Sequence, residues 1–393
     1  MTCCFVSCTS LTLQEAVQTS LLSRRWQNLW SSLMWINVDA AKFSSIRTFK
    51  SFIDNLILYR SSLPVPVPLD VFFISAICNN CDNSLEYSDI HPWIRHALDS
   101  NAWALGILKH SGPKALSMEG YPFPFTSAHL KILALCNCSI DDWFVQNVSS
   151  CCPVLDDLEL MSCAIHVTMF SSTKLKTLSI TSTQIEKDFP EEFQYLVIDM
   201  PNLVSLCLEE IPRRNIHLMD VSSVKSASIY LFSLSFGNSQ VHCSILSALS
   251  NAHTLTLVSA SVFEDVVPKV LQHDLRRCDT FRYLKVLHLG EWFMSGGCCP
   301  LIKLLRRSPG IEKVLLQLDK SGDDDYERLP NADAEIDPPN QEAVTTFSCE
   351  KLRKIKIYRD PESDKRAQIV VRILSAHLSP LPVIKIKPVS LQV

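Results

Sequence analysis

The sequence predicts an α/β fold built from repeats, a solenoid in which short strands alternate with turns or helices. The main observation is a triplet of aliphatic residues spaced Leu-x-x-Leu-x-Leu. Copies start at Leu130, Leu155, Leu175, Leu203, Leu284, Ile311 and Leu352, with weaker ones at Val224 and around Leu255. Most successive copies lie within the period of about 20–29 residues that is typical of leucine-rich repeats. We therefore expect a leucine-rich-repeat solenoid, shaped as a horseshoe.

Each triplet predicts one short strand of the solenoid. Side chains alternate across a strand, so the second and third aliphatic residues point into the core and the residues around them point to the concave face. The segments between strands supply turns or helices on the convex side. Residues 141–148 are one such segment, and Asp141 and Asp142 suit a helix N-terminus.

We call the series of aliphatic triplets the ladder. The region before the ladder predicts helices and one strand. Apolar residues recur every three to five positions over residues 11–60, and Pro64, Pro66 and Pro68 end this helical pattern. Residues 71–74 predict a buried strand and residues 91–108 a further helix. Leu116 and Met118 are expected to begin the ladder as a partial repeat.

Composition restricts the class of protein. The chain has 393 residues, of which 47% are hydrophobic, enough for a large core. Its net charge of -4 gives no global basic field, so we expect no nucleic-acid partner. The first residues lack a basic region, and no apolar run is long enough to span a bilayer. We expect a protein of the cytoplasm or nucleus, without a membrane partner, whose 16 cysteines are reduced core residues.

The motifs give no support to an enzyme. The sequence lacks a nucleophile elbow, a phosphate-binding loop and a His-Glu-x-x-His run. Cys78-x-x-Cys81 has the spacing of a zinc or redox pair, but a zinc site needs a second pair of ligands that the sequence does not supply. Cys3-Cys4 is a second alternative, as an acylation site. We expect no metal and no cofactor.

Both ends of the chain resemble a known family. Residues 15–30, which include Ser-Leu-Leu-Ser-Arg-Arg-Trp-Gln-Asn-Leu-Trp, resemble the second half of the F-box in plant F-box proteins that carry leucine-rich repeats. Residues 347–358 resemble the start of the FBD-type tail of these proteins. A complete F-box begins with a Leu-Pro pair and an apolar helix, in whose place this chain has Met1 to Ser10. The resemblance is thus to a plant F-box/leucine-rich-repeat (FBD-like) protein with an N-terminally incomplete F-box.

The resemblance implies a substrate receptor of an SCF-type ubiquitin ligase. The F-box would bind a Skp-family adaptor and, through it, a cullin scaffold, while the repeats would hold a protein substrate. The alternative is a repeat-based binding module that does not engage the ligase. The adaptor-binding residues expected are Val17, Leu21, Leu22, Arg24, Arg25, Trp26, Leu29 and Trp30. Tryptophan and arginine are frequent interface anchors, although a local core for the tryptophans and a solvated helix face for the arginines are the plainer interpretations.

The outward positions of the strands are the candidate substrate-binding residues. The strongest candidates are Asp157, Glu159, Thr177, Ser179, Glu209, Lys313, Lys354 and Lys356. The early positions are acidic, the middle ones are small and hydroxylic, and the late ones are basic. We hypothesise that this order orients a dipolar peptide, while chance placement of the charges is the simpler alternative.

Four segments follow from these patterns. Residues 1–45 form a helical partial F-box, and residues 46–112 form a helical and strand region that leads into the repeats. Residues 113–345 form the solenoid, with an acidic, mobile loop at 319–344 where charge and proline prevent burial. Residues 346–393 form an FBD-like cap.

Overall fold

The computed structural model describes residues 13, 17, 32–76, 85–109, 115–116, 125–181, 183, 195–209, 211, 215–231, 245–259, 271, 274–318, 346–359 and 364–388. The chain divides into two compact units, Met1–Pro190 (unit 1) and Glu191–Val393 (unit 2). Each unit is an α/β repeat structure with a parallel sheet.

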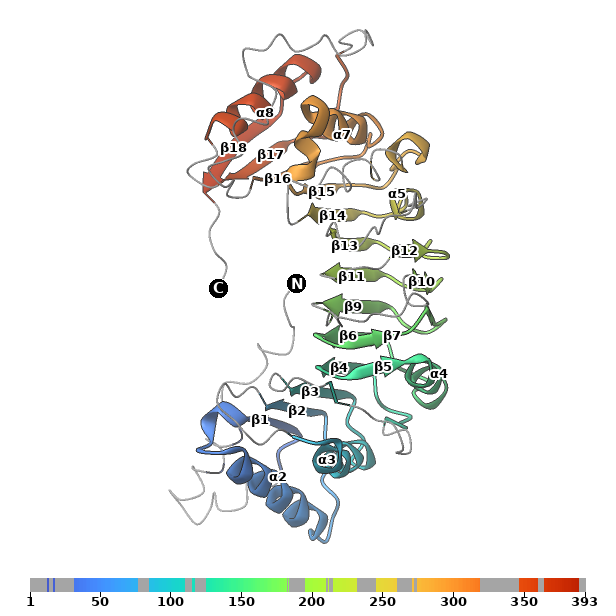
Figure 1. Cartoon of the computed structure of the whole chain (residues 1–393), viewed down its shortest axis with the longest axis vertical. Helices are drawn as coiled ribbons and strands as arrows, with labels where there is room; N and C mark the ends of the chain where they lie inside the picture. The colour runs from blue at the N-terminus through green and yellow to red at the C-terminus, as the bar shows by residue number, and fades with distance from the viewer. Residues whose placement is uncertain are drawn as a thin grey trace. The chain divides into compact units, whose positions relative to one another are not determined.

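Within the described residues of unit 1, the main sheet contains six parallel strands that pair in sequence order (Figure 1). They are β1 (Trp35–Asp39), β2 (Val71–Ala76), β3 (Ala104–Lys109), β4 (Ile132–Cys136), β6 (Asp157–Met161) and β9 (Thr177–Thr181). The connections hold η2 (Ala40–Lys42), α2 (Ile46–Ser61), α3 (Tyr87–Asp99), α4 (Asp142–Cys151) and the short strands β5 (Ser139–Asp141), β7 (Ala164–His166) and β8 (Met169–Ser171).

Unit 2 continues the same construction with parallel strands in sequence order (Figure 1). They are β11 (Ser205–Glu209), β13 (Ser226–Leu231), β14 (Thr254–Ser259), β15 (Val286–Leu289), β16 (Lys313–Leu318), β17 (Lys354–Arg359) and β18 (Val383–Pro388). A separate pair is formed by β10 (Tyr195–Asp199) and β12 (Asn215–Leu218). Its helical segments include α5 (Ile245–Ala248), η5 (Glu291–Met294), α7 (Ser295–Arg306) and α8 (Asp364–His377).

The aliphatic ladder forms the core, as the alternation predicts. The second and third residue of every triplet are buried: Leu133, Leu135, Leu158, Leu160, Leu178, Ile180, Leu206, Leu208, Ala227, Ile229, Leu255, Leu257, Leu287, Leu289, Val314, Leu316, Ile355 and Ile357. The first residue is buried as well, because a tight turn leads into the strand. The amide of Leu203, for example, donates to the carbonyl of Met200 at 3.1 Å, and the amide of Leu352 donates to that of Cys349 at 3.0 Å.

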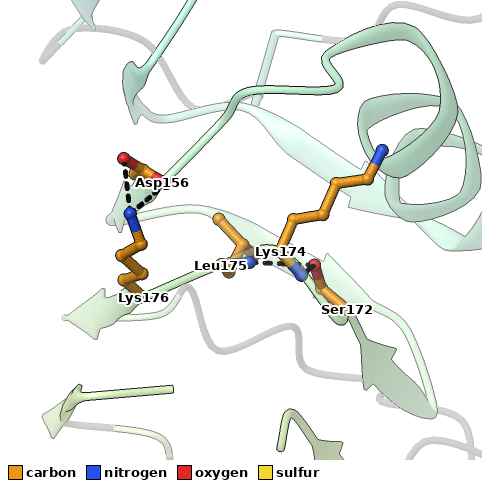
Figure 2. Close-up of polar contacts among 5 residues, drawn as sticks. All are labelled: Asp156, Ser172, Lys174, Leu175 and Lys176. Carbon is orange, nitrogen blue, oxygen red and sulfur yellow. Dashed lines mark hydrogen bonds and ion pairs between the residues drawn. The ribbon is translucent and has the colours of Figure 1, made fainter. Parts of the chain in front are cut away.

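A buried serine makes a second kind of turn before two of the triplets. The hydroxyl of Ser172 accepts from the amides of Lys174 and Leu175, both at 3.2 Å (Figure 2). Ser127 makes the same pair of bonds with the amides of His129 and Leu130. In the spacing Ser-x-x-Leu, the serine hydroxyl thus accepts hydrogen bonds from two backbone amides. Without it, these amides would have no partner where the chain enters the core.

Several predicted elements are confirmed. Helix α2 begins at Ile46, where Ser45 and Thr48 form a capping box, and ends at Ser61 ahead of Pro64. Strand β2 covers the predicted strand at 71–74. Helix α4 lies in the predicted segment, and its N-cap Asp141 accepts from the amide of Phe144 at 2.8 Å.

Two helix predictions are wrong in part. Residues 35–39, expected within a helix, form β1, and residues 104–109, expected in the helix 91–108, form β3. In β1 the buried residues Ile36 and Val38 have the period of a strand, and backbone pairing with β2 overrides the apolar composition that favoured a helix. The sheet therefore begins three strands before the ladder, with β1 inside the segment predicted as a helical partial F-box and β2 and β3 in the region predicted to lead into the repeats.

Some predictions lie outside the described residues. These include the pair Cys78 and Cys81, the acidic loop at 319–344, Met118 and most of the first 31 residues of the partial F-box. The described cysteines carry free thiols, and most are buried, as expected of small core residues. Within the described ranges, no helix has the length and apolarity to cross a bilayer, and no cluster of His, Cys, Asp or Glu side chains suits a metal ion.

Candidate functional site

The strand register brings the outward side chains into rows. In unit 1, Asp157 lies opposite Thr177 and Glu159 lies opposite Ser179, all of them half-buried. The structure therefore brings these four predicted residues together on one face of β6 and β9. The same register places the apolar Ile132 and Ala134 of β4 beside the two carboxylates.

The carboxylate of Asp157 lies in an unfavourable environment. Burial, followed by the charges of Glu159 and Asp156, raises its pKa to about 6. Asp156 itself pairs with Lys176, whose Nζ lies 3.0 Å from Oδ1 (Figure 2). Lys176 therefore pairs with Asp156 and not with Asp157. The repulsion between the carboxylates of Asp157 and Glu159 remains.

We expect Asp157→Asn to stabilise the protein at neutral pH. Because the folded-state pKa of Asp157 is raised, protonation favours the folded state, so its contribution is fully present below about pH 4 and is lost as the pH rises through about 6. Since the group is partly exposed, we expect a gain of about 1–2 kcal/mol at pH 7.5 and little change at pH 4. Urea unfolding at the two pH values measures this.

The exposed Asp99 provides the control for this prediction. Its carboxylate is 69% exposed and lies 3.6 Å from Arg95 on the same helix. Asp99→Asn is expected to change the free energy of unfolding by less than about 0.5 kcal/mol at both pH values. An equal gain from the two variants would contradict the role of burial at Asp157.

The first strands of unit 2 present a neutral face. Ser205, Ser226 and Thr254 lie in one row, and Cys207, Ser228 and Thr256 lie in the next. The predicted residue Glu209 ends β11, where the thiol of Cys207 donates to its Oε1 at 3.4 Å. Burial, then the charges of Glu209 and Cys207, raises the pKa of the nearby Tyr230, so this hydroxyl stays neutral at physiological pH.

The last strands of unit 2 present a basic face. Lys313 lies opposite Lys354, and Lys356 lies opposite Lys385 on β18. The charge of Lys385, then burial and the charges of Lys356, Lys387 and Lys313, lowers the pKa of Lys354. The structure therefore brings the three predicted lysines together and adds Lys385 and Lys387, which the sequence analysis missed.

A signal for these two lysines is present in the sequence. Residues 384–387 alternate isoleucine and lysine, as residues 354–357 do. That alternation would have predicted one more strand with lysines on its outward face.

The predicted adaptor-binding residues are almost all outside the described part of the chain. Val17 is helical and half-buried, and the nearby Leu13 is helical and fully buried. The other seven residues, from Leu21 to Trp30, lie among residues that the structure does not describe. The adaptor-binding set thus remains a prediction from the sequence.

Comparison with known proteins identifies the repeats. Residues 102–229 match a family model described as the leucine-rich repeats of the FBD-associated F-box protein At5g56370. The putative F-box protein At3g44060 of Arabidopsis thaliana is 22% identical over 277 residues, which cover 64% of this chain and 64% of the relative. The F-box/FBD/LRR-repeat protein At5g22660 of the same plant is 23% identical over 418 residues, which cover 93% of this chain and 90% of the relative.

A third relative is more similar over a shorter stretch. The FBD-associated F-box protein At1g66310 of Arabidopsis thaliana is 35% identical over 86 residues, which cover 22% of this chain and 19% of the relative. The chain thus spans less than two thirds of the length of At3g44060 and At1g66310, and most of At5g22660. The family model and the relatives show that the chain is similar to plant leucine-rich-repeat proteins of the F-box/FBD type, and the parallel ladder of buried aliphatic residues agrees with such repeats.

Proposed function

We propose that the chain is the substrate-recruiting subunit of an SCF-type ubiquitin ligase in the cytoplasm or nucleus. A short helical F-box segment near the N-terminus binds a Skp-family adaptor, which connects the chain to a cullin scaffold. The repeats form a horseshoe-shaped solenoid and hold the target protein, and the chain performs no chemical reaction itself. The observation that carries this proposal is the F-box named in the relatives, together with a repeat sheet whose outward rows are polar.

The outward rows suit a binding role for a physical reason. Their side chains stand on strands whose inner residues are fully buried, so the backbone beneath them is fixed and little order is lost on binding. In this proposal, the substrate-binding residues of unit 1 are Asp157, Glu159, Thr177 and Ser179. Those of unit 2 are Glu209, Lys313, Lys354 and Lys356.

The adaptor-binding part of the proposal concerns the F-box segment. Val17, Leu21, Leu22 and Leu29 would supply apolar contacts, and Trp26, Trp30, Arg24 and Arg25 the anchors. Aromatic anchors at the centre of an interface often contribute 2 kcal/mol or more on truncation to alanine. We therefore expect Trp26→Ala to weaken binding of a purified plant Skp-family adaptor by about 30-fold in isothermal titration calorimetry with the whole chain.

A matched control is Trp103→Ala. Trp103 is 39% exposed and lies just before β3, outside the F-box segment. It should leave adaptor binding unchanged within about twofold. If the unmodified chain does not bind the adaptor at all, the ligase proposal is wrong, and the chain is a repeat-based binding module without a ligase partner.

A further inference from the structure

Five lysines form a continuous surface on the last three strands of unit 2. Lys313 stands on β16, Lys354 and Lys356 on β17, and Lys385 and Lys387 on β18. Cross-strand pairing places Lys313 beside Lys354, Lys356 beside Lys385, and Tyr358 beside Lys387. We call this diagonal set the lysine band.

All five side chains point to the same face of the sheet. The residues that alternate with the lysines on β17, Ile355 and Ile357, are fully buried. Helix α8 also contacts β17. Side chains alternate across a strand, so the lysines lie on the face opposite to these isoleucines. Lys313, Lys354 and Lys356 are half-buried, while Lys385 and Lys387 are exposed.

Protection of a sheet edge accounts for only part of the band. Among the described strands, β18 pairs with β17 alone, and lysines on such an edge strand discourage aggregation. Lys313, Lys354 and Lys356, however, stand on β16 and β17, which are paired on both sides. Lysines on these inner strands repel one another and do not protect the edge of the sheet. Edge protection therefore does not explain them, and ligand binding is the remaining explanation.

The charge of the band is not balanced within the described part of the chain. None of the ion pairs between described residues contains one of the five lysines. The neighbouring positive charges lower the pKa of Lys354, with Lys385 as the largest cause. An anionic ligand would relieve this repulsion.

The dimensions of the band fit a short extended peptide. Alternate residues of a strand lie about 7 Å apart, and neighbouring strands lie about 4.8 Å apart. The band therefore extends over about 16 Å between the backbones of Lys313 and Lys387, the length of about five residues of extended chain. Carboxylates at every second position of a peptide repeat at the same distance as the lysines along β17 and β18.

We propose that the lysine band binds an acidic segment of a partner protein, about five residues long, in an extended conformation. Peptide is favoured over nucleic acid for two reasons. The band lies beside the side chains of Leu315 and Tyr358, which offer apolar contacts to a peptide, and Lys356 Nζ lies 5.9 Å from the centre of the Tyr358 ring. The band also contains no arginine, and the whole chain has a net charge of -4, unlike a protein with an extended basic footprint for phosphates.

The test measures binding of a fluorescein-labelled peptide to the whole chain by fluorescence anisotropy. The peptide has about ten residues that alternate glutamate and threonine, and its control alternates glutamine and threonine. We expect Lys354→Gln/Lys385→Gln to weaken binding of the glutamate peptide about tenfold, at about 3-fold for each charge removed. Raising the salt concentration from about 50 to about 200 mM should weaken binding as well.

Lys365→Gln/Arg372→Gln is the matched control. It removes the same charge from exposed positions of α8, on the other side of the sheet, and should leave binding within about twofold. Circular dichroism and thermal unfolding verify that both double variants are folded. Equal binding of the peptide by the unmodified chain and the Lys354/Lys385 variant would overturn the proposal. Tighter binding of an oligouridine RNA or of phosphatidylserine vesicles than of the glutamate peptide, lost in the same variant, would overturn it too.

This inference deepens the proposed function, since it names the chemical class of the recruited partner. The peptide measurement contains no Skp-family adaptor, and the calorimetric measurement contains no peptide. Either proposal can therefore fail while the other holds.

Discussion

Arg366→Met is expected to lower the free energy of unfolding of unit 2 by about 3–5 kcal/mol. The Nη1 atom of Arg366 on α8 lies 2.8 Å from Oε1 of Glu291 in η5, and both side chains are only 6% exposed. Without the guanidinium, the carboxylate of Glu291 would lose this ion pair and stay buried beside the fully buried Trp292 and Phe293. Urea unfolding followed by far-UV circular dichroism measures the loss.

Two control variants separate the burial of the charge from the loss of a contact. Glu291→Leu/Arg366→Met removes both charges and is expected to lie within about 1 kcal/mol of the unmodified protein. Glu312→Ala breaks an exposed pair with Lys285, at 3.8 Å and with side chains 58% and 46% exposed, and should have an effect below about 1 kcal/mol. A loss no larger for Arg366→Met than for Glu312→Ala would contradict the prediction.

This ion pair has a consequence for the candidate binding face. Helix α8 packs on β17, the strand that carries Lys354 and Lys356, and η5 contacts β14 and β16. The indole of Trp292 also donates to the carbonyl of Leu257 on β14 at 3.0 Å. The buried pair thus joins two elements that support the strands of the lysine band from the inner side of the sheet.

The ladder and its outward rows were predictable because both depend on local alternation. A buried aliphatic residue at every second position defines the inner face, and the positions between them face outward regardless of the rest of the fold. The registers that join Asp157 with Thr177 and Lys313 with Lys354 follow directly from aligning the triplets. The same rule, applied to residues 383–387, would have supplied the two missing lysines.

The remaining features depend on contacts between distant parts of the chain. Residues 35–39 are apolar enough for a helix, and only pairing with residues 71–75 makes them a strand. Glu291 and Arg366 belong to elements separated by helix α7, two strands and a long stretch outside the described residues, and no local pattern links them. Burial of Asp157 likewise depends on its neighbours in β4 and β9, which a single strand does not reveal.

Leu255→Ala is expected to destabilise the strands around β14 by about 2–5 kcal/mol, the range for removing a buried leucine side chain. Leu255 is fully buried and lies in register with Ala227 on β13 and Leu287 on β15. Because each repeat packs mainly on its neighbours, the cavity would weaken β13 and β15 together with β14.

Hydrogen exchange followed by mass spectrometry measures this locally, which matters because a chain of this size need not unfold in one step. The amides of β13, β14 and β15 should exchange about 30-fold faster or more in Leu255→Ala, whereas those of β1 and β2 should keep their rates. The matched control is Thr256→Val, which alters the adjacent outward position while preserving its shape and strand preference, and should change exchange rates less than about threefold. If both variants accelerated exchange equally, the inner and outward positions would be energetically equivalent. The ladder would then not be the main source of stability beneath the binding face.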